Sequence, residues 1–409
     1  MAKVVTRGLS MAPLILPKDT LIIEKNYEYG PNDIVVFKKD RKFIAHRVIY
    51  RSGGKIVTKG DRNLKDDGFI EKGEIFGRVT AIRRREDNLL INHFYLSQSS
   101  SYLRELSKIA KAFAGARVPY VFIKGLPIHL FIKDAVPKRL YIDADILIKK
   151  TSAALAHKVL GKLGFSKVSE GEAFGVLGRE PTQLTFYKNI SPFPVVVDLH
   201  LDIALGFTRA TAVNDLLPNL DKFTDLIFKE SVSYKVGKVS FRIPKKEFIF
   251  IILLIHFFHH NFKGASSLNF MKEVLVKCKL DFKKLARIVS SFRLKNFIFP
   301  SALIMNRFYP GSLPKDFLEK IKPVLPRTVV SGLFSLISWP FSEEERVIAG
   351  MKRFMLIIIL SPKKVSDKLK ILFKKELIRY YFVSIRSLFS SSLRKLSRSF
   401  SVSSSETSK

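Results

Sequence analysis

Residue types that support nucleophilic catalysis gather near the start of the chain. Ser10 lies in the run Gly8–Pro13, His46 follows later, and several aspartates occur in the run Lys59–Asp67. A serine can attack a carbonyl group, a histidine can take the serine proton, and an aspartate can orient the imidazole. These residue types alone are a weak signal, because most domains contain them. Their spacing and the sequences around them therefore decide the interpretation.

Short runs rich in β-branched and aromatic residues surround these candidates, and turn-forming residues separate the runs. The runs are Leu21–Ile23, Ile34–Phe37, Phe43–Ala45, Arg47–Tyr50 and Lys55–Thr58. This pattern predicts an all-β domain in which His46 lies on a strand. In the alternative interpretation, Ser10 is a turn residue, His46 is a half-buried strand residue and the aspartates form a solvated loop.

Four short sequence motifs, in the following order along the chain, extend this pattern over residues 1–85. They read Gly-x-Ser-Met-x-Pro, Gly-x-x-Asp-Ile-Val-Val-Phe, His-Arg-Val and Lys-Gly-Asp-x-Asn-x-x-Asp-Asp. This portion resembles the signal peptidases of the archaeal and endoplasmic-reticulum type. The resemblance implies a cofactor-free serine endopeptidase with Ser10 as nucleophile, His46 as general base and Asp67 as the residue that orients His46. It places Asp61 in the same set, as a support for the local structure.

The chain departs from that family before its serine. Family members carry a transmembrane helix there, whereas Met1–Leu9 is too short to span a bilayer. No positively charged and then apolar segment marks a signal peptide. We therefore expect neither a transmembrane segment nor a signal peptide, and the family's usual removal of leader peptides outside the membrane is not expected.

A second group of candidates is acidic. Side chains alternate between the faces of a strand, so Asp143 and Asp145 should share one face, and Asp198 lies in a later strand-like run, Val195–Ile203. Neighbouring carboxylates repel each other unless a cation neutralises them, and Mg²⁺ prefers oxygen ligands. The pattern predicts metal-dependent nucleotidyl transfer. The alternative is that these carboxylates lie at strand ends and face solvent.

The sequence around these acids is also informative. A Lys-Gly pair, then Arg with Asp-x-Asp, then Asp-Leu-His, over about residues 105–290, resembles the uncharacterised nucleotidyltransferase family. The resemblance implies that the three aspartates hold Mg²⁺ and that the domain binds a nucleoside triphosphate. Gly125 would let the backbone approach the phosphates, and Lys124 or Arg139 would counter their charge. It leaves the role of His200 open.

The remaining sequence reads as helical. Phe248–Phe258 is apolar but too short to cross a bilayer, which indicates a buried helix. His256 and His259 are spaced to share a helix face; a core or substrate-facing role is favoured over a metal site. Residues 363–383 form a basic amphipathic pattern that predicts contact with an anionic membrane or, as the favoured alternative, packing on the protein's own domains.

Charge and cysteine content limit the partners. The chain has 409 residues and a formal net charge of +35, which favours phosphate-bearing ligands, anionic lipid or acidic protein surfaces. Nucleic acid is disfavoured but stays open, because no recognised binding module with interleaved aromatic residues is present. The single cysteine, Cys278, rules out an internal disulfide framework and suits a reducing compartment.

Together these features predict a multidomain protein. We expect an all-β protease-like domain at 1–85, a linker and helix start at 86–104, an α/β nucleotidyltransferase-like domain with a helical follow-on at 105–300, a basic helical region at 301–383 and a disordered tail at 384–409. Because a triphosphate is used, a cytoplasmic location is expected, and peripheral contact with a membrane stays open. The leading hypothesis is a bifunctional enzyme acting on a peptide or protein and on a nucleotide. The alternatives are a transferase with a non-catalytic first domain, or an assembly protein at a membrane surface or on nucleic acid.

Overall fold

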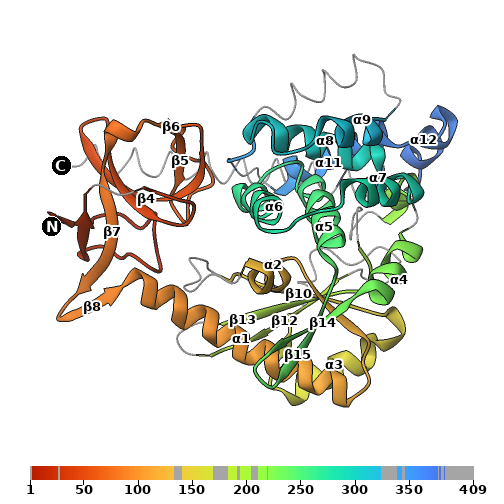
Figure 1. Cartoon of the computed structure of the whole chain (residues 1–409), viewed down its shortest axis with the longest axis horizontal. Coiled ribbons are helices and arrows are strands. Elements are labelled where there is room, and N and C mark those ends of the chain that lie inside the picture. Colours follow the sequence, from red (N-terminus) through yellow and green to blue (C-terminus); the bar gives the residue numbers. More distant parts are fainter. Residues whose placement is uncertain are drawn as a thin grey trace.

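The computed structural model of the chain describes residues 2–25, 28–132, 141–168, 183–190, 194–203, 211–218, 220–323, 339–342, 346–375, 377–378 and 382. Arg139 and the predicted tail at 384–409 lie outside these residues. The first sheet occupies one end of the molecule, and the central sheet and the helices occupy the other (Figure 1).

The N-terminal part forms an eight-stranded antiparallel sheet with the order β1-β2-β7-β3-β4-β5-β6, and β8 pairs with β7. Its strands are β1 (Ala2–Val5), β2 (Thr20–Glu24), β3 (Ile34–Lys39), β4 (Lys42–Ser52), β5 (Lys55–Lys59), β6 (Phe69–Ile70), β7 (Ile75–Arg84) and β8 (Asp87–Leu90). Two predicted runs belong to one long strand, β4, and His46 lies in its middle. The predicted strand position of His46 is therefore confirmed.

Strand β3 contributes to two hydrophobic cores because its alternate side chains point to opposite faces. Ile34 and Val36 enter a core that also contains Tyr95, whereas Val35 and Phe37 enter a second core. These four side chains of β3 are almost fully buried. Burial on both faces fixes β3 firmly beside β4, the strand that carries His46.

The central sheet has five strands in the order β11-β12-β13-β10-β9, and β10 and β13 are parallel neighbours. Its strands are β9 (Tyr120–Ile123), β10 (Ala144–Ile148), β11 (Ser166–Lys167), β12 (Gln183–Lys188) and β13 (Val195–His200). The helices α1 (Ile91–Gly115), α2 (Gly125–Ile132), α3 (Ala153–Lys162) and α4 (Asp221–Glu230) and the hairpin of β14 (Val232–Val236) and β15 (Val239–Ile243) accompany it.

Helix α1 corrects the predicted linker. It begins at Ile91 and runs through Ser97–Ser101, so these serines are not the linker and helix cap expected from their composition. Gln98 shows the reason: its side chain is buried and forms hydrogen bonds with both backbone groups of Tyr141. Contacts of this buried face outweigh the low helix propensity of serine. The helix joins the first and central sheets without a break (Figure 1).

The C-terminal half is helical. Its helices are α5 (Lys246–His259), α6 (Ala265–Lys277), α7 (Phe282–Ser291), α8 (Lys295–Phe308), α9 (Lys315–Ile321), α11 (Arg346–Leu360) and α12 (Val365–Leu372). Helix α5 is buried nearly all round, as predicted for Phe248–Phe258. Within the described part of the chain, no helix has both the length and the apolar character needed to cross a membrane.

An aromatic contact joins the first sheet to the helices. The Tyr50 hydroxyl donates a 2.6 Å hydrogen bond to the carbonyl of Phe308, and the Tyr50 ring lies 4.7 Å from that of Phe341. Asn269 of α6 donates a 2.8 Å bond to the carbonyl of Ile49. Buried aromatic rings add area burial and directional ring contacts. The first sheet and the C-terminal helices therefore share one hydrophobic core.

Candidate active sites

Ser10, His46 and Asp67 lie in hydrogen-bond contact, and His46 is on the interior strand β4 of the first sheet. Ser10 Oγ is 3.0 Å from His46 Nε2, and His46 Nδ1 is 2.7 Å from Asp67 Oδ2. The hydroxyl of Thr58 donates a 2.7 Å bond to the same carboxylate oxygen. A carboxylate at Nδ1 favours the tautomer with its proton on Nδ1, which leaves Nε2 to accept the serine proton. The three predicted residues are therefore brought together in the order that acyl transfer needs.

Gly60 closes the space behind this pair. A side-chain carbon at this position would lie 2.9 Å from His46 Nε2, Ser10 Cβ and Asn63 Nδ2. Only a residue without a side chain allows the backbone to approach so closely. The amide of Arg62 also donates a 2.8 Å bond to the carbonyl of Ser10, which holds the serine segment against the loop that follows β5.

Asp61 has a different partner from Asp67. It forms a two-point ion pair with Arg47, with both nitrogen–oxygen distances at 2.7 Å. Arg47 is buried and also donates to the hydroxyl of Tyr95 on α1. Burial lowers the pKa of Arg47, but Tyr95 and Asp61 outweigh it and hold the pKa above its usual value. In this geometry Asp61 anchors the loop that carries Asp67, which agrees with a supporting position.

Asp66 connects the same loop to the helical half. Its Oδ2 accepts a 2.7 Å hydrogen bond from Trp339 Nε1 and another from Ser342. Burial raises the pKa of Asp66, but these two hydrogen bonds and a backbone bond lower it below its usual value. The carboxylate therefore stays charged and ties the neighbour of Asp67 to a segment far away in sequence.

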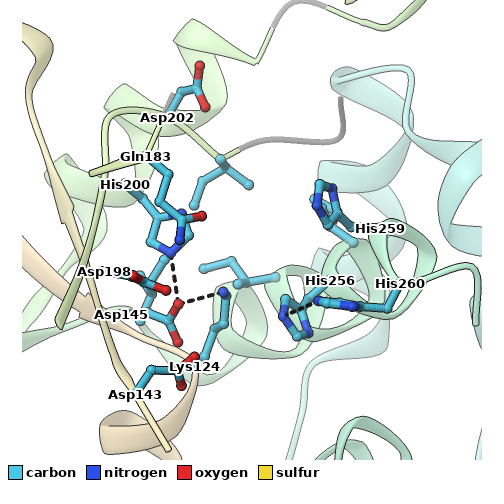
Figure 2. A pocket seen from close by; sticks show the side chains of 14 residues that line it. Lys124, Asp143, Asp145, Gln183, Asp198, His200, Asp202, His256, His259 and His260 are labelled. Carbon is cyan, nitrogen blue, oxygen red and sulfur yellow. Dashed lines mark hydrogen bonds and ion pairs between the residues drawn. The ribbon is translucent and has the colours of Figure 1, made fainter. Parts of the chain in front are cut away.

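The acidic candidates meet in a pocket between the central sheet and α5 (Figure 2). Asp145 on β10 and Asp198 on β13 are direct neighbours in the parallel register. Ligand atoms of Asp145, Asp198 and His200 lie within 4.8 Å of one another, as a metal site requires. Asp143 lines the same pocket but is not part of this group. The cavity measures about 230 Å³.

Lys124 and His200 stabilise the negative charge of Asp145. Lys124 Nζ lies 2.6 Å and His200 Nε2 lies 2.8 Å from the same oxygen, Asp145 Oδ1. Burial raises the pKa of Asp145, but Lys124 and His200 lower it far below the usual value. Because His200 donates its Nε2 proton to the carboxylate, it orients a possible ligand, as outer partners of metal ligands do. Asp143, Asp145 and Asp198 supply the oxygen donors that Mg²⁺ prefers, so the residues fit this ion.

The predicted nucleotide-binding residues are only partly described. Lys124 has a positive φ of 59° and directly precedes Gly125, where α2 begins. The side chain of Lys124 lines the acid pocket. Arg139 lies outside the described residues.

Two residues at this site, Thr185 and Gln183, were not predicted from the sequence. Thr185 on β12 donates a 2.7 Å hydrogen bond to Asp198 Oδ1, and Gln183 on the same strand lines the cavity. Neither residue stands in a recognisable motif, because β12 reaches the pocket only through its antiparallel pairing with β13. Burial raises the pKa of Asp202, which also lines the pocket. Asp202 was recognisable from its alternation with Asp198.

Three histidines form the opposite wall (Figure 2). His256 and His260 are one helical turn apart, and their Nε2 atoms are 3.1 Å from each other. His259 instead contacts Arg353, whose Nη1 lies 3.1 Å from His259 Nε2. His256 and His259, which were predicted to share a helix face, both line the pocket, as does His260. Their core or substrate-facing role stays a prediction.

Helix α12 carries the basic amphipathic pattern. Val365, Leu369 and Phe373 are 71%, 48% and 75% exposed, whereas Ile371 is buried. The predicted stripe is therefore divided between the protein core and the surface.

The central α/β sheet thus carries acids on adjacent strands, with Lys124 beside them and a helical wall across the pocket. Residues 93–310, more than half of the chain, match the sequence model of a family described as "Uncharacterised nucleotidyltransferase". The chain belongs to this family. The solution structure of the antibiotic-resistance factor ANT(2'')-Ia is similar at 13% identity and a TM-score of 0.32, covering 51% of this chain and 98% of that one. No curated protein matches the chain.

Proposed function

We propose that the central domain transfers a nucleotidyl group from a nucleoside triphosphate to an acceptor hydroxyl. The acceptor oxygen forms a bond to the α-phosphorus, the bond to the β-phosphate oxygen breaks, and pyrophosphate leaves with the electron pair. The acceptor proton passes to water. Asp143, Asp145 and Asp198 would hold Mg²⁺, which supplies charge neutralisation for the triphosphate. Lys124, Gly125 and Arg139 are the residues proposed to bind the nucleotide.

The parallel register of Asp145 and Asp198 carries this proposal. It sets two carboxylates side by side at one pocket wall, with His200 and Lys124 already holding one of them. A buried pair of like charges is costly without a cation. Membership of the nucleotidyltransferase family supports the same reaction class.

Transfer of label from α-labelled triphosphates tests this function. Wild-type protein with Mg²⁺ is expected to label an acceptor in a mixture of candidate small molecules and peptides, or to label itself. Asp145→Asn and Asp198→Asn should each lower the rate by at least about a hundredfold, since each removes charge stabilisation of several kcal/mol. Asp225→Asn, on the solvent-exposed side of α4, is the matched control and should keep the rate. Equal rates in all variants would reject the metal assignment.

A second activity is favoured by the contacts of Ser10. We propose that Ser10 attacks a peptide carbonyl while His46 Nε2 takes its proton, and that Asp67 stabilises the resulting imidazolium. The amine leaves with the proton from His46, and water then releases the acyl group. The distances of 3.0 Å and 2.7 Å along the chain of three residues support this role. The signal-peptidase-like assignment of residues 1–85 stays part of this proposal.

A fluorophosphonate probe tests the serine. Wild-type protein should be labelled at Ser10, and Ser10→Ala should abolish the label. Ser52→Ala, on β4 away from the triad, should be labelled as wild type is. If Ser10→Ala is labelled as fast as wild type, the first sheet acts as a binding module and the transferase activity stands alone.

We also propose that α12 touches anionic membranes. Its exposed Val365, Leu369 and Phe373 are accompanied by Lys364, Lys368 and Lys370, and apolar area with adjacent lysines favours acidic lipid surfaces. Flotation with anionic vesicles should fall when Leu369 and Phe373 are changed to serine, and neutral vesicles should recover little protein in either case. Both proposed reactions would then occur in the compartment that supplies the triphosphate, which favours the cytoplasmic side.

A further inference from the structure

The histidine wall contains a buried donor that the nucleotidyl-transfer proposal does not use. Arg353 Nη1 lies 3.1 Å from His259 Nε2. A guanidinium group only donates hydrogen bonds, so Nε2 must accept, and the ring proton is on Nδ1. Nδ1 is buried and has no hydrogen-bond partner among the residues that the structure describes. A buried N–H group without an acceptor is costly, which indicates that a ligand supplies one.

Two fixed cations lie near this donor. Arg353 contacts His259 Nε2, and Lys124 lines the cavity together with His256, His259 and His260. Burial, followed by the charge of Arg353, lowers the pKa of His259 well below its usual value. Burial, followed by Arg353 and Lys124, lowers the pKa of His260 to about 4. These imidazoles are therefore neutral near neutral pH, and an anion attracted by Arg353 and Lys124 would accept the free proton of His259.

The two walls of the pocket differ in charge. Asp143, Asp145 and Asp198 belong to the sheet wall together with Lys124, whereas the three imidazoles belong to the helical wall, across the cavity in Figure 2. Arg353 contacts one of these imidazoles, that of His259. In the proposed reaction, the α-phosphate would lie at the acidic wall, and the β- and γ-phosphates would extend toward the helical wall. The leaving pyrophosphate gains charge as its bond breaks, and fixed donors and cations stabilise such charge.

We propose that His259 and Arg353 form a binding site for phosphoryl oxygens, and that it takes the pyrophosphate end of the nucleoside triphosphate. The site rests on the proposed function for its role, but its anion binding needs neither metal nor catalysis. His259 Nδ1 donates to a phosphate oxygen, and Arg353 holds the imidazole in the required tautomer while adding its own charge.

Calorimetric titration of the full chain with inorganic pyrophosphate in EDTA tests the site. Wild-type protein should bind pyrophosphate, and Arg353→Met and His259→Phe should each weaken binding by about tenfold or more, because each removes a hydrogen bond to a charged group. Lys352→Met removes the same charge one residue earlier on α11 and should change affinity less than twofold. Arg353→Lys should recover part of the affinity, which a purely structural role of the residue would not require.

Two further measurements locate the ligand. A nucleoside triphosphate should compete with pyrophosphate, whereas a nucleoside monophosphate should not. Simultaneous binding of triphosphate and pyrophosphate would place a phosphorylated acceptor at this wall and overturn the assignment to the leaving group. Absence of pyrophosphate binding in EDTA, or an equal loss in Lys352→Met, would overturn the site itself. If label transfer fails while pyrophosphate binding and its Arg353 dependence persist, the proposed reaction is wrong and the anion site stands.

Discussion

The two candidate sites differ in how their polar groups are satisfied. In the first sheet, Ser10, His46, Asp67 and Thr58 form a continuous chain of hydrogen bonds with one another. In the central pocket, a carboxylate takes two donors on one oxygen, and the facing His259 keeps a buried Nδ1 without a partner in the described part of the chain. The first arrangement is complete within the protein, whereas the second provides groups for ions that must come from outside.

Electrostatics explains this difference. A hydroxyl, an imidazole and a single carboxylate carry one negative charge, which Thr58 and His46 stabilise by hydrogen bonding. Adjacent carboxylates such as Asp145 and Asp198 accumulate charge that only cations can offset. Lys124 offsets the charge of Asp145, which stabilises the pocket before a substrate arrives. The following predictions test this comparison between a self-contained site and a site that depends on ions.

Asp67→Asn should produce the largest effect. An amide in place of the carboxylate can donate to His46 Nδ1, which favours the wrong tautomer and blocks proton transfer from Ser10. Labelling by a fluorophosphonate probe is expected to slow by about 10⁴-fold, the cost of this change in a related triad. The measurement is the second-order labelling rate. Asp40→Asn, in the exposed turn after β3, is the control and should label normally. A rate unchanged by Asp67→Asn would mean that the observed hydrogen bonds do not serve catalysis.

His200→Asn should have the next largest effect and acts on the other site. Without His200, Asp145 loses the donor at 2.8 Å that orients it. Loss of such an outer partner weakens metal binding by about 10–100-fold. Titration with Mn²⁺, followed by electron paramagnetic resonance, measures the affinity directly. His157→Gln on the exposed face of α3 should bind Mn²⁺ as wild type does, and similar losses in both variants would contradict the orienting role.

Each candidate site could be predicted only in part from the sequence, and the predictable part differs between the two sites. Ser10, His46 and Asp67 stood in ordered boxes, and a strand could be assigned to His46 from its β-branched neighbours. The contact between Asp66 and Trp339 could not be predicted, because nothing local to either residue indicates a partner so distant in sequence. Tertiary contacts of this kind depend on how whole elements assemble.

The central pocket shows a similar division. Period-two alternation identified Asp143, Asp145 and Asp198, since it depends only on strand geometry. The role of His200 stayed open, because its bond to Asp145 follows from the parallel register of two strands that the chain does not connect directly. The serines within α1 were misread as a linker for the opposite reason: local propensity favoured a cap, and packing of Gln98 decided otherwise.

Acidification should destabilise the histidine wall. Burial and nearby cations keep the pKa of His256 and His259 well below the usual value and lower that of His260 to about 4. In the unfolded chain these groups titrate near about 6.5. Between these values the unfolded state binds more protons, so the free energy of unfolding should fall as the pH drops from about 6.5 toward about 4. Besides burial, Lys124 lowers all three pKa values and Arg353 lowers those of His259 and His260, whereas Asp145 raises that of His260.

Denaturant unfolding at several pH values measures this dependence. Added pyrophosphate should reduce the loss, because an anion favours protonated histidines in the folded state. His260→Gln should flatten the curve in the same interval, whereas His157→Gln on α3 should leave it unchanged. A free energy that stays constant from pH 6.5 to 4 in wild type would contradict the lowered pKa values.

Trp339→Phe should have the smallest effect and tests whether the two regions act on each other. Phenylalanine keeps the ring contact with Phe69, at 5.0 Å, but loses the 2.7 Å hydrogen bond to Asp66. The free energy of unfolding should fall by about 1 kcal/mol. Tyr50→Phe removes a different hydrogen bond across the same interface and serves as the matched control.

Comparison of the two variants distinguishes interface stability from an effect on the triad. Asp66 adjoins Asp67, so a loosened Asp66 should let the loop move and slow the labelling of Ser10 in Trp339→Phe. Tyr50→Phe should lose similar stability and label at the wild-type rate, because its bond does not involve that loop. Equal labelling in both variants would mean that the helical half only supports the first sheet. A difference would mean that the segment beginning at Trp339, which also accepts a hydrogen bond from Lys263 beyond the histidine wall, connects the pocket to the triad.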